Sequence, residues 1–207
     1  MPEQPRYHIP ADRHRVEDEI KRSRFITTVA YTPTPEAARE FLAEMRAEFS
    51  NASHNCWAYV IGPPGSTGQV GMSDDGEPHG TAGRPMLTVL LHSDVGDITA
   101  VVTRYFGGTL LGKGGLVKAY TGGVKLALES LPVIERVPKV DVLVVVSYST
   151  VTPLQRVWDD YEIEVQDEEY AADVTYTLTL PESQLPPFEA MLTELTNGQA
   201  MLEVIEG

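Results

Sequence analysis

The chain has 207 residues, enough for one large domain or two small ones with hydrophobic cores of their own. Its hydrophobic content of 42% and charged content of 22% are ordinary for a globular protein, and no run of about 18 apolar residues indicates a membrane span. Residues 1–10 contain no apolar signal core, and the single cysteine, Cys56, excludes an internal disulfide. We therefore expect a cytoplasmic protein that does not enter a membrane.

The first half of the chain predicts alternating strands and helices. Residues 15–31 are typical of a strand or a strand pair, and residues 55–61 of another strand. Thr34 is placed to cap a helix that has Pro35 at its first position. Residues 62–71 are rich in glycine and proline and predict a loop, and Thr81 is placed to cap a helix that ends near Leu91. The apolar face of the first helix consists of Ala38, Phe41, Leu42 and Met45.

The most informative stretch covers residues 97–131. Residues 98–102 are apolar and β-branched and predict a buried strand. A loop with five glycines follows, and then an apolar pattern at helical spacing. Between Arg104 and Lys125 the chain carries four basic residues and no acidic one, although the whole chain has a formal net charge of -14. This local reversal of sign indicates a surface for something negatively charged.

The second half predicts a compact pattern of its own. Residues 140–147 are a continuous apolar strand, and Thr152 to Gln155 resemble a capping box that opens a helix to about Tyr161. Residues 162–165 and 173–180 alternate as half-exposed strands, a helix that ends at Asn197 follows, and residues 200–205 are a last strand. The order βαββαβ is the ferredoxin-like pattern, and the fold class is α+β.

Charge separates the two halves. From Lys139 onward there are fourteen acidic residues and only two basic ones, whereas residues 1–138 are nearly balanced. The difference argues for two domains joined near residues 132–138, namely residues 1–135 and residues 139–207. Because phosphate repels carboxylates, we expect any polyanion to bind the first half.

The glycine-rich loop predicts an anion site where a strand passes into a helix. The first backbone N–H groups of a helix lack internal partners, and the helix dipole favours negative charge there. Residues 107–113 fit the phosphate-binding pattern G-x-x-x-x-G-K, but Gly114 stands where a nucleotide-hydrolysing loop has Ser or Thr for magnesium. Two alternatives stay open, a P-loop nucleotidase and a tight turn needed only for packing. The candidate anion-binding or nucleic-acid-binding residues are Arg104, Tyr105, Gly107, Gly108, Gly112, Lys113, Gly114, Gly115 and Lys118.

A second polar cluster precedes the strand at residue 98. Its carboxylates and imidazoles suit a divalent metal, but their spacing matches no metal motif. The alternative is a turn in which Asp74 or Asp75 accepts backbone N–H bonds and pairs with Arg84 or Arg104. We assign no catalytic residue, no metal and no cofactor, and Cys56 on a strand is interpreted as a core residue. The cluster consists of His54, Asp74, Asp75, Glu77, His79 and Arg84.

Four ordered stretches resemble the IMPACT/YigZ family. They are residues 23–25 (SRF), residues 53–59 (SHNCWAY), residues 73–86 (SDDGEPHGTAGRPM) and residues 102–120 (VTRYFGGTLLGKGGLVKAY). The resemblance implies a first domain like the second domain of ribosomal protein S5 and a ferredoxin-like second domain of the bacterial YigZ branch. It also implies a role in translational control, as in eukaryotic IMPACT.

Three functions are compatible with these features. The first is a non-enzymatic binding protein that engages RNA, the ribosome or a translation factor through the basic glycine loop. The second is an enzyme for a small phosphorylated or acidic substrate, with a metal as a possible helper. That enzyme requires a concave site where the glycine loop and the second polar cluster converge. The third is a protein–protein module that uses the acidic second domain. The sequence leaves the oligomeric state open.

Overall fold

The computed structural model describes residues 6–205. Residues 1–5, in the stretch without a signal core, and residues 206–207, at the acidic end, lie outside the described part. Contacts divide the chain into two compact units: Tyr7–Arg136 forms one, and the residues from Val137 onward form the other, together with Arg6. No helix among residues 6–205 is long and apolar enough to cross a membrane.

The first unit is built on a five-stranded antiparallel sheet with the order β2-β3-β6-β4-β5. The central strand β6 is buried along almost its whole length, as its apolar sequence predicts. The strand pair expected in residues 15–31 is confirmed, whereas β5 begins inside the predicted loop. The strands are β2 (His14–Ile20), β3 (Ser23–Tyr31), β4 (His54–Ile61), β5 (Gln69–Ser73) and β6 (Ile98–Tyr105).

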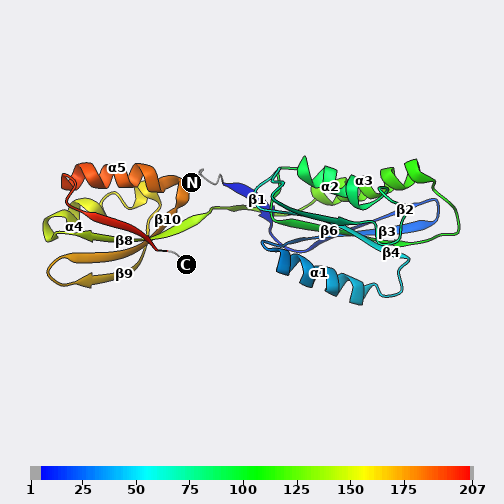
Figure 1. The fold of residues 1–207 in the computed structure, drawn as a ribbon, viewed down its shortest axis with the longest axis horizontal. Helices are drawn as coiled ribbons and strands as arrows, with labels where there is room; N and C mark the ends of the chain where they lie inside the picture. Colours follow the sequence, from blue (N-terminus) through cyan, green and yellow to red (C-terminus); the bar gives the residue numbers. More distant parts are fainter. Residues whose placement is uncertain (1–5, 206–207) are drawn as a thin grey trace. The chain divides into compact units, whose positions relative to one another are not determined.

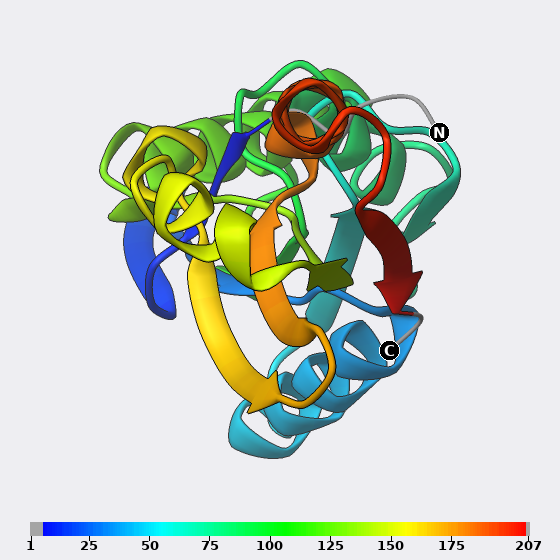
Figure 2. The ribbon, with the colours of Figure 1, turned by 90° about the vertical axis from the view of Figure 1, so that its left-hand side faces the viewer.

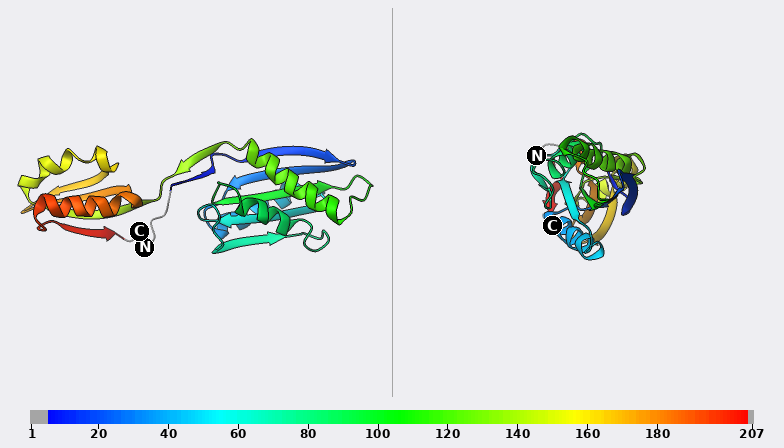
Figure 3. Two further views of the ribbon diagram at one scale, coloured as in Figure 1. Left: turned by 90° about the horizontal axis from the view of Figure 1, so that it is seen from above. Right: turned by 90° about the vertical axis from the view of Figure 1, so that its right-hand side faces the viewer.

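Helices cover both faces of this sheet. Figure 1 shows α1 (Pro35–Glu48) on one face and α2 (Gly83–Leu91) with α3 (Lys113–Glu129) on the other, and Figure 3 shows α2 and α3 lying over the strands from above. Two hydrophobic clusters result, one under α1 and a larger one under α2 and α3. Thr34 caps α1 through a bond from Ala37 N to its Oγ1, which confirms the predicted start of that helix.

A short ribbon that the sequence did not predict closes this unit. Strands β1 (Tyr7–Pro10) and β7 (Val133–Arg136) pair in antiparallel fashion and bring the two ends of the unit together. Tyr7 donates from its hydroxyl to Asp97 at 2.6 Å and accepts from Arg136 at 2.6 Å. The pairing spans the whole unit in sequence, which is why no local pattern indicates it.

The second unit has the predicted βαββαβ order. Its antiparallel sheet has the strand order β11-β8-β10-β9, and Figure 2 shows these strands toward the viewer with α5 seen along its axis. Side chains of both helices pack on one face of the sheet. The elements are β8 (Lys139–Val146), α4 (Tyr148–Gln155), η1 (Asp159–Tyr161), β9 (Glu164–Tyr170), β10 (Val174–Pro181), η2 (Glu182–Gln184), α5 (Leu185–Thr196) and β11 (Met201–Ile205).

Two predicted helix starts are wrong. Helix α2 has Ala82 at its N-cap, which has no side-chain acceptor, and the Thr81 hydroxyl donates to Pro78 O instead of capping the helix. Helix α4 begins four residues before the predicted capping box, so that Pro153 lies inside it, and it ends at Gln155. The predicted end of α5 is confirmed, since Asn197 adopts the left-handed conformation.

Candidate functional site

The site begins as a row of three side chains across neighbouring strands. In the register of the sheet, Arg104 on β6 faces Phe25 on β3 and His54 on β4. Successive strand residues point to opposite faces, so Arg104 lies under α2 and α3 while Tyr105 lies on the α1 face. Tyr105 donates from its hydroxyl to Asn51 at 2.9 Å. Its predicted place beside Arg104 in one anion site is therefore wrong.

Arg104 is held by an internal network. It is 5% exposed, and its Nη1 donates to Glu77 Oε1 at 2.6 Å. The hydroxyl of Tyr120 donates to the same oxygen at 2.8 Å. The guanidinium also lies 5.5 Å from the ring centres of Phe25 and of Phe106. In the alternative that paired Asp74 or Asp75 with Arg84 or Arg104, the pairing with Arg104 is wrong, because Arg104 pairs with Glu77. A guanidinium buried against Glu77 is not free to bind a phosphate at the surface.

His54 has one nitrogen fixed and one turned toward this network. Its Nδ1 lies 2.8 Å from Asp75 O, and because a carbonyl oxygen can only accept, Nδ1 carries the proton. In the neutral ring Nε2 is then an acceptor, and it lies 3.9 Å from Glu77 Oε1. The sequence placed His54 and Glu77 in one candidate cluster, but neither spacing nor charge predicted the pair of Glu77 with Arg104, since these two residues come from separate segments.

The glycines of the loop have different roles. A Cβ on Gly107 would lie 1.9 Å from Arg22 O, so this glycine lets the loop pack against the β2–β3 turn. Gly108 and Gly112 have φ angles of +84° and +73°, which favour glycine. Gly114 has open space at its Cβ position. Gly107 is therefore structural, whereas Gly112 and Gly114 belong to the exposed start of α3.

The N-terminus of α3 has no side-chain cap. Helix α3 begins at Lys113 after Gly112, whose position offers no side-chain cap, and among residues 6–205 no side-chain acceptor is bonded to the N–H groups of its first turn. Its first turn contains no acidic residue, and Lys113 is exposed beside it. The partial positive charge of the helix end and the ammonium group of Lys113 therefore add up at one place.

The uncapped end of α3 opens into a cavity of about 470 Å³. His54, Glu77 and Arg104 form its polar part, and Gly112 and Lys113 bring in the glycine loop. The convergence of the two loops in one concave site, which the sequence suggested, is present. The apolar part of the lining was not predicted, although the aromatic residue and the two leucines within the glycine loop could have indicated it. The apolar lining consists of Pro78, Phe106, Leu110, Leu111 and Leu116.

Asp74 and Asp75 serve the backbone. Asp74 Oδ1 accepts from Ala82 N at 3.0 Å and Gly83 N at 2.9 Å, and its Oδ2 accepts from Gly80 N at 2.8 Å. Burial raises the pKa of Asp74, but the three N–H groups together lower it by more. The pKa therefore lies below its usual value of 3.8. Asp75 accepts from Asn55 N at 2.7 Å and lies 3.5 Å from Arg46.

The Asp74→Ala substitution tests this role. Two N–H groups at the start of α2 and one in the loop before it would lose a charged acceptor, and we expect the free energy of unfolding to fall by ~1–2 kcal/mol at pH 7. Because folding lowers the pKa of Asp74, its contribution is present above the unfolded pKa and is lost as the pH falls through the folded value. The difference between wild type and Asp74→Ala in urea denaturation should therefore shrink below about pH 4. A difference that stays constant down to pH 2 would contradict this account.

The remaining predicted residues lie outside the cavity. His79 and Arg84 are exposed and line a separate cavity of about 520 Å³ together with Asp74. Lys118 is exposed on α3 but does not line the site, and Gly115 lies against Leu111. Among residues 6–205, no three His, Cys, Asp or Glu side chains are grouped so as to hold a metal ion. Burial raises the pKa of the Cys56 thiol to about 12, so Cys56 is not a nucleophile near neutral pH.

Comparison with known proteins agrees with the two-unit organisation. Residues 21–128 match the Impact N-terminal domain, and residues 144–199 match a domain of unknown function, DUF1949. The IMPACT family member YigZ of Escherichia coli is 44% identical over 198 residues, which cover 96% of this chain and 97% of YigZ. The chain belongs to the IMPACT family.

Other members of the IMPACT family extend this likeness. The member YvyE of Bacillus subtilis is 36% identical and covers 87% of this chain, which in turn covers 82% of YvyE. A solved structure described as a hypothetical protein is 43% identical and superimposes with a TM-score of 0.69. The match covers 97% of this chain and 98% of that protein. The match to the Impact N-terminal domain covers residues 73–86 and 102–120, which contribute to the cavity, since both stretches fall within residues 21–128.

Proposed function

We propose that this IMPACT family protein is a non-enzymatic regulator of translation that binds RNA through its basic glycine-rich loop. The single observation that carries the proposal is the uncapped N-terminus of α3, which opens with Lys113 into a cavity. A phosphate group would accept from the first N–H groups of the helix and pair with the lysine. Ribosomal RNA is one such ligand, and a translation factor bound to the same RNA fits the same role.

The lining of the cavity favours single-stranded RNA. Phe106 is 49% exposed and Leu110 is 82% exposed, and both lie beside the phosphate position. Unstacked bases bind proteins by stacking on exposed aromatic rings, while the backbone follows positive charge. The β2–β3 turn, which contains exposed Lys21 and Arg22, packs against Gly107 and adds cations beside the loop. Phosphate-rich RNA is repelled by the acidic second unit, so the first unit is where it would bind.

Lys113→Ala is the direct test. We expect a fluorescein-labelled RNA of about 20 nucleotides to bind the full chain and the variant to bind about five- to tenfold more weakly, because one charge-assisted phosphate contact is lost. In a salt titration the slope of log affinity against log salt should fall by about 0.7 for this single-stranded RNA. Fluorescence anisotropy measures both quantities.

Lys125→Ala is the matched control. It removes the same charge from an exposed position further along the same helix, and Lys125 does not line the cavity. Arg104→Ala is not a suitable test, because it would disturb the buried pair with Glu77. Equal loss of affinity in Lys113→Ala and Lys125→Ala would show that charge alone attracts RNA, and no RNA binding by the wild type would reject the proposal.

A second candidate function is an enzyme for a small phosphorylated or acidic substrate. The observation that favours it is the presence of His54 in the same cavity, with Nε2 available as an acceptor of a proton. Phosphate release from a panel of nucleotides and sugar phosphates, with and without Mg²⁺, separates the two functions. If the wild type turns over a substrate and His54→Gln abolishes that turnover, the enzyme function replaces the RNA-binding proposal. If there is no turnover and RNA binds, the RNA-binding proposal is supported.

A further inference from the structure

One face of the sheet in the second unit is uncovered. The side chains of Val142, Val144 and Val146 are buried against α4 and α5, and the alternate residues of β8 point to the opposite face. Within the described residues, no helix of this unit lies on that opposite face (Figure 1). We call this side of the β11-β8-β10-β9 sheet, opposite to α4 and α5, the open face.

The residues of the open face change in kind from one edge of the sheet to the other. In register, the first row is Met201, Val145, Thr175 and Glu169; the second is Glu203, Leu143, Thr177 and Asp167; and the third is Ile205, Asp141, Thr179 and Glu164. Each row runs from β11 through β8 and β10 to β9. Strands β11 and β8 therefore supply most of the apolar side chains, β10 supplies hydroxyls, and β9 supplies only carboxylates.

Both edges of this face are accessible. Met201 is 51% exposed and Ile205 is 40% exposed, and every residue of β9 is exposed. Glu164 pairs with Lys139 and Asp141 accepts from Thr179. Within the described residues no ion pair forms at Asp167, Glu169 or Glu203, so three carboxylates are left without a cation. A binding partner that complements both edges must carry apolar groups on one side and cations on the other.

The width of the face matches a helix. Neighbouring strands lie about 4.8 Å apart, so β8 and β9 are separated by about 10 Å across β10. An α-helix with its side chains is also about 10 Å wide. A helix that lies over the threonines of β10 therefore reaches β8 and β11 with one flank and β9 with the other.

We infer that the open face binds a basic amphipathic helix of a partner protein. The apolar stripe of that helix packs on Val145, Leu143 and Met201, and its lysines or arginines pair with Asp167 and Glu169. The helix adds the missing layer to the sheet, since a sheet with an apolar side gains stability when a helix covers it. The inference does not depend on RNA binding by the first unit.

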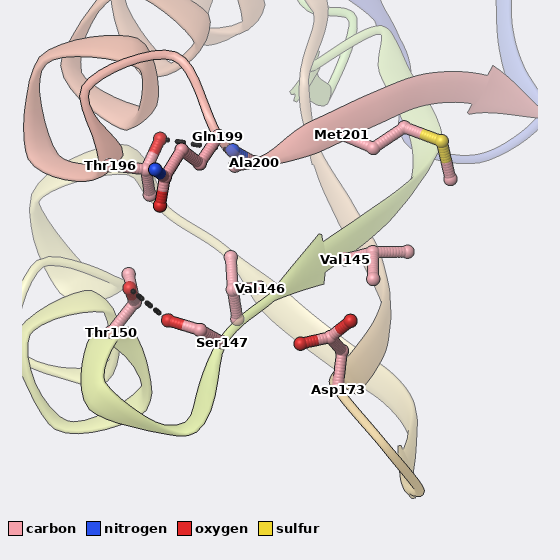
Figure 4. A pocket seen from close by; sticks show the side chains of 9 residues that line it. All are labelled: Val145, Val146, Ser147, Thr150, Asp173, Thr196, Gln199, Ala200 and Met201. Carbon is pink, nitrogen blue, oxygen red and sulfur yellow. Dashed lines mark hydrogen bonds between the residues drawn. The ribbon is translucent and has the colours of Figure 1, made fainter.

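A hollow at one end of the sheet extends the same surface. Figure 4 shows Val145, Met201 and Asp173 among the side chains that line it, with the hydroxyls of Ser147 and Thr150 on the other side. Its volume is about 230 Å³. A long basic side chain near the end of the partner helix fits there, because its methylene groups meet Val145 and Met201 and its charge meets Asp173.

The chemistry of the face disfavours two other occupants. Nucleic acid would meet the carboxylates of β9 with its phosphates, and no aromatic residue of the open face offers a stacking surface. A second copy of the chain would bring a further excess of negative charge to this acidic face, and that charge would oppose association.

The experiment uses the full chain and a designed peptide. The probe is an amphipathic peptide of about 18 residues, or five helical turns, with leucine on one side and lysine on the other. The control peptide has the same composition in scrambled order, so that its charge is unchanged. Binding is measured by fluorescence anisotropy at 0.15 M salt, and the site is located by amide chemical shifts in the labelled protein.

We expect the amphipathic peptide to bind and to shift amides of β8, β10 and β11. The variant Asp167→Asn/Glu169→Gln should bind it about tenfold more weakly, because two charge pairs with the peptide are lost. The matched variant Glu189→Gln/Glu194→Gln, which removes two exposed carboxylates from α5, should bind as the wild type does. Met201→Ser should also weaken binding, which a purely electrostatic attraction would not show.

Other results would overturn the inference. They are equal binding of the scrambled peptide, equal loss in the α5 variant, shifts confined to α4 and α5, or no binding at all. Concentration-dependent dimerisation in sedimentation that Met201→Lys abolishes would assign the open face to a second copy of the chain instead.

Discussion

Arg104→Ala is expected to destabilise the first unit by about 3–5 kcal/mol, the largest effect of any single change considered. The substitution leaves Glu77 charged in a site where it is 8% exposed and where, among residues 6–205, Arg104 is the one lysine or arginine paired with it. Trp57 belongs to the first unit and Trp158 to the second, and they are the two tryptophans of the chain. In a Trp158→Phe background, the fluorescence of Trp57 during urea denaturation therefore reports the first unit alone.

A double substitution separates the charge from the packing. Arg104→Met combined with Glu77→Gln removes both charges, keeps side chains of similar size and leaves an oxygen to accept from Tyr120. If the uncompensated carboxylate is the cause, the double variant should recover at least half of the lost stability. A double variant as unstable as Arg104→Ala would show that shape, rather than charge, makes Arg104 necessary.

Gly107→Ala is expected to destabilise the same unit by about 1–3 kcal/mol, since an added methyl group must displace its neighbours. Its Cβ would lie 1.9 Å from Arg22 O and 2.5 Å from Ser23 N, and backbone atoms of a strand pair cannot rotate away as a side chain can. The β2–β3 turn would be pushed from the loop, and the Trp57 reporter measures the loss.

Gly114→Ala is the matched control in the same loop. Its Cβ position is open, and alanine is the better helix former, so the variant should be as stable as the wild type or slightly more stable. Equal destabilisation by both substitutions would mean that glycine supplies flexibility throughout the loop. The expected difference assigns a packing role to Gly107 and none to Gly114.

Much of the architecture was predictable because it depends on short-range patterns. The Thr34 cap, the Asn197 end and the alternation of β10 each follow from neighbouring residues. The order βαββαβ followed from the sequence of these patterns. The glycine loop was recognised as a strand-to-helix turn with a reversed local charge, and α3 does begin there.

The errors share a long-range cause. Thr81 does not cap α2, since Asp74, eight residues before Ala82, accepts from the start of that helix. Arg104 belongs by sequence to the basic loop, yet alternation along β6 turns its side chain under the helices and toward Glu77. A count of basic residues along a stretch of sequence does not show to which face of the sheet each side chain points.

The sequence by itself determined the family, the two-unit organisation of elements and the place of the exposed glycine loop, because periodicity, caps and local charge are properties of adjacent residues. The tertiary structure alone decided which polar groups face a ligand and which hold the fold. Strands β4 and β6 and the loop between β5 and α2 must come together before His54, Arg104 and Glu77 meet. Only this assembly buries one charge pair and leaves Lys113 and the start of α3 exposed at the cavity.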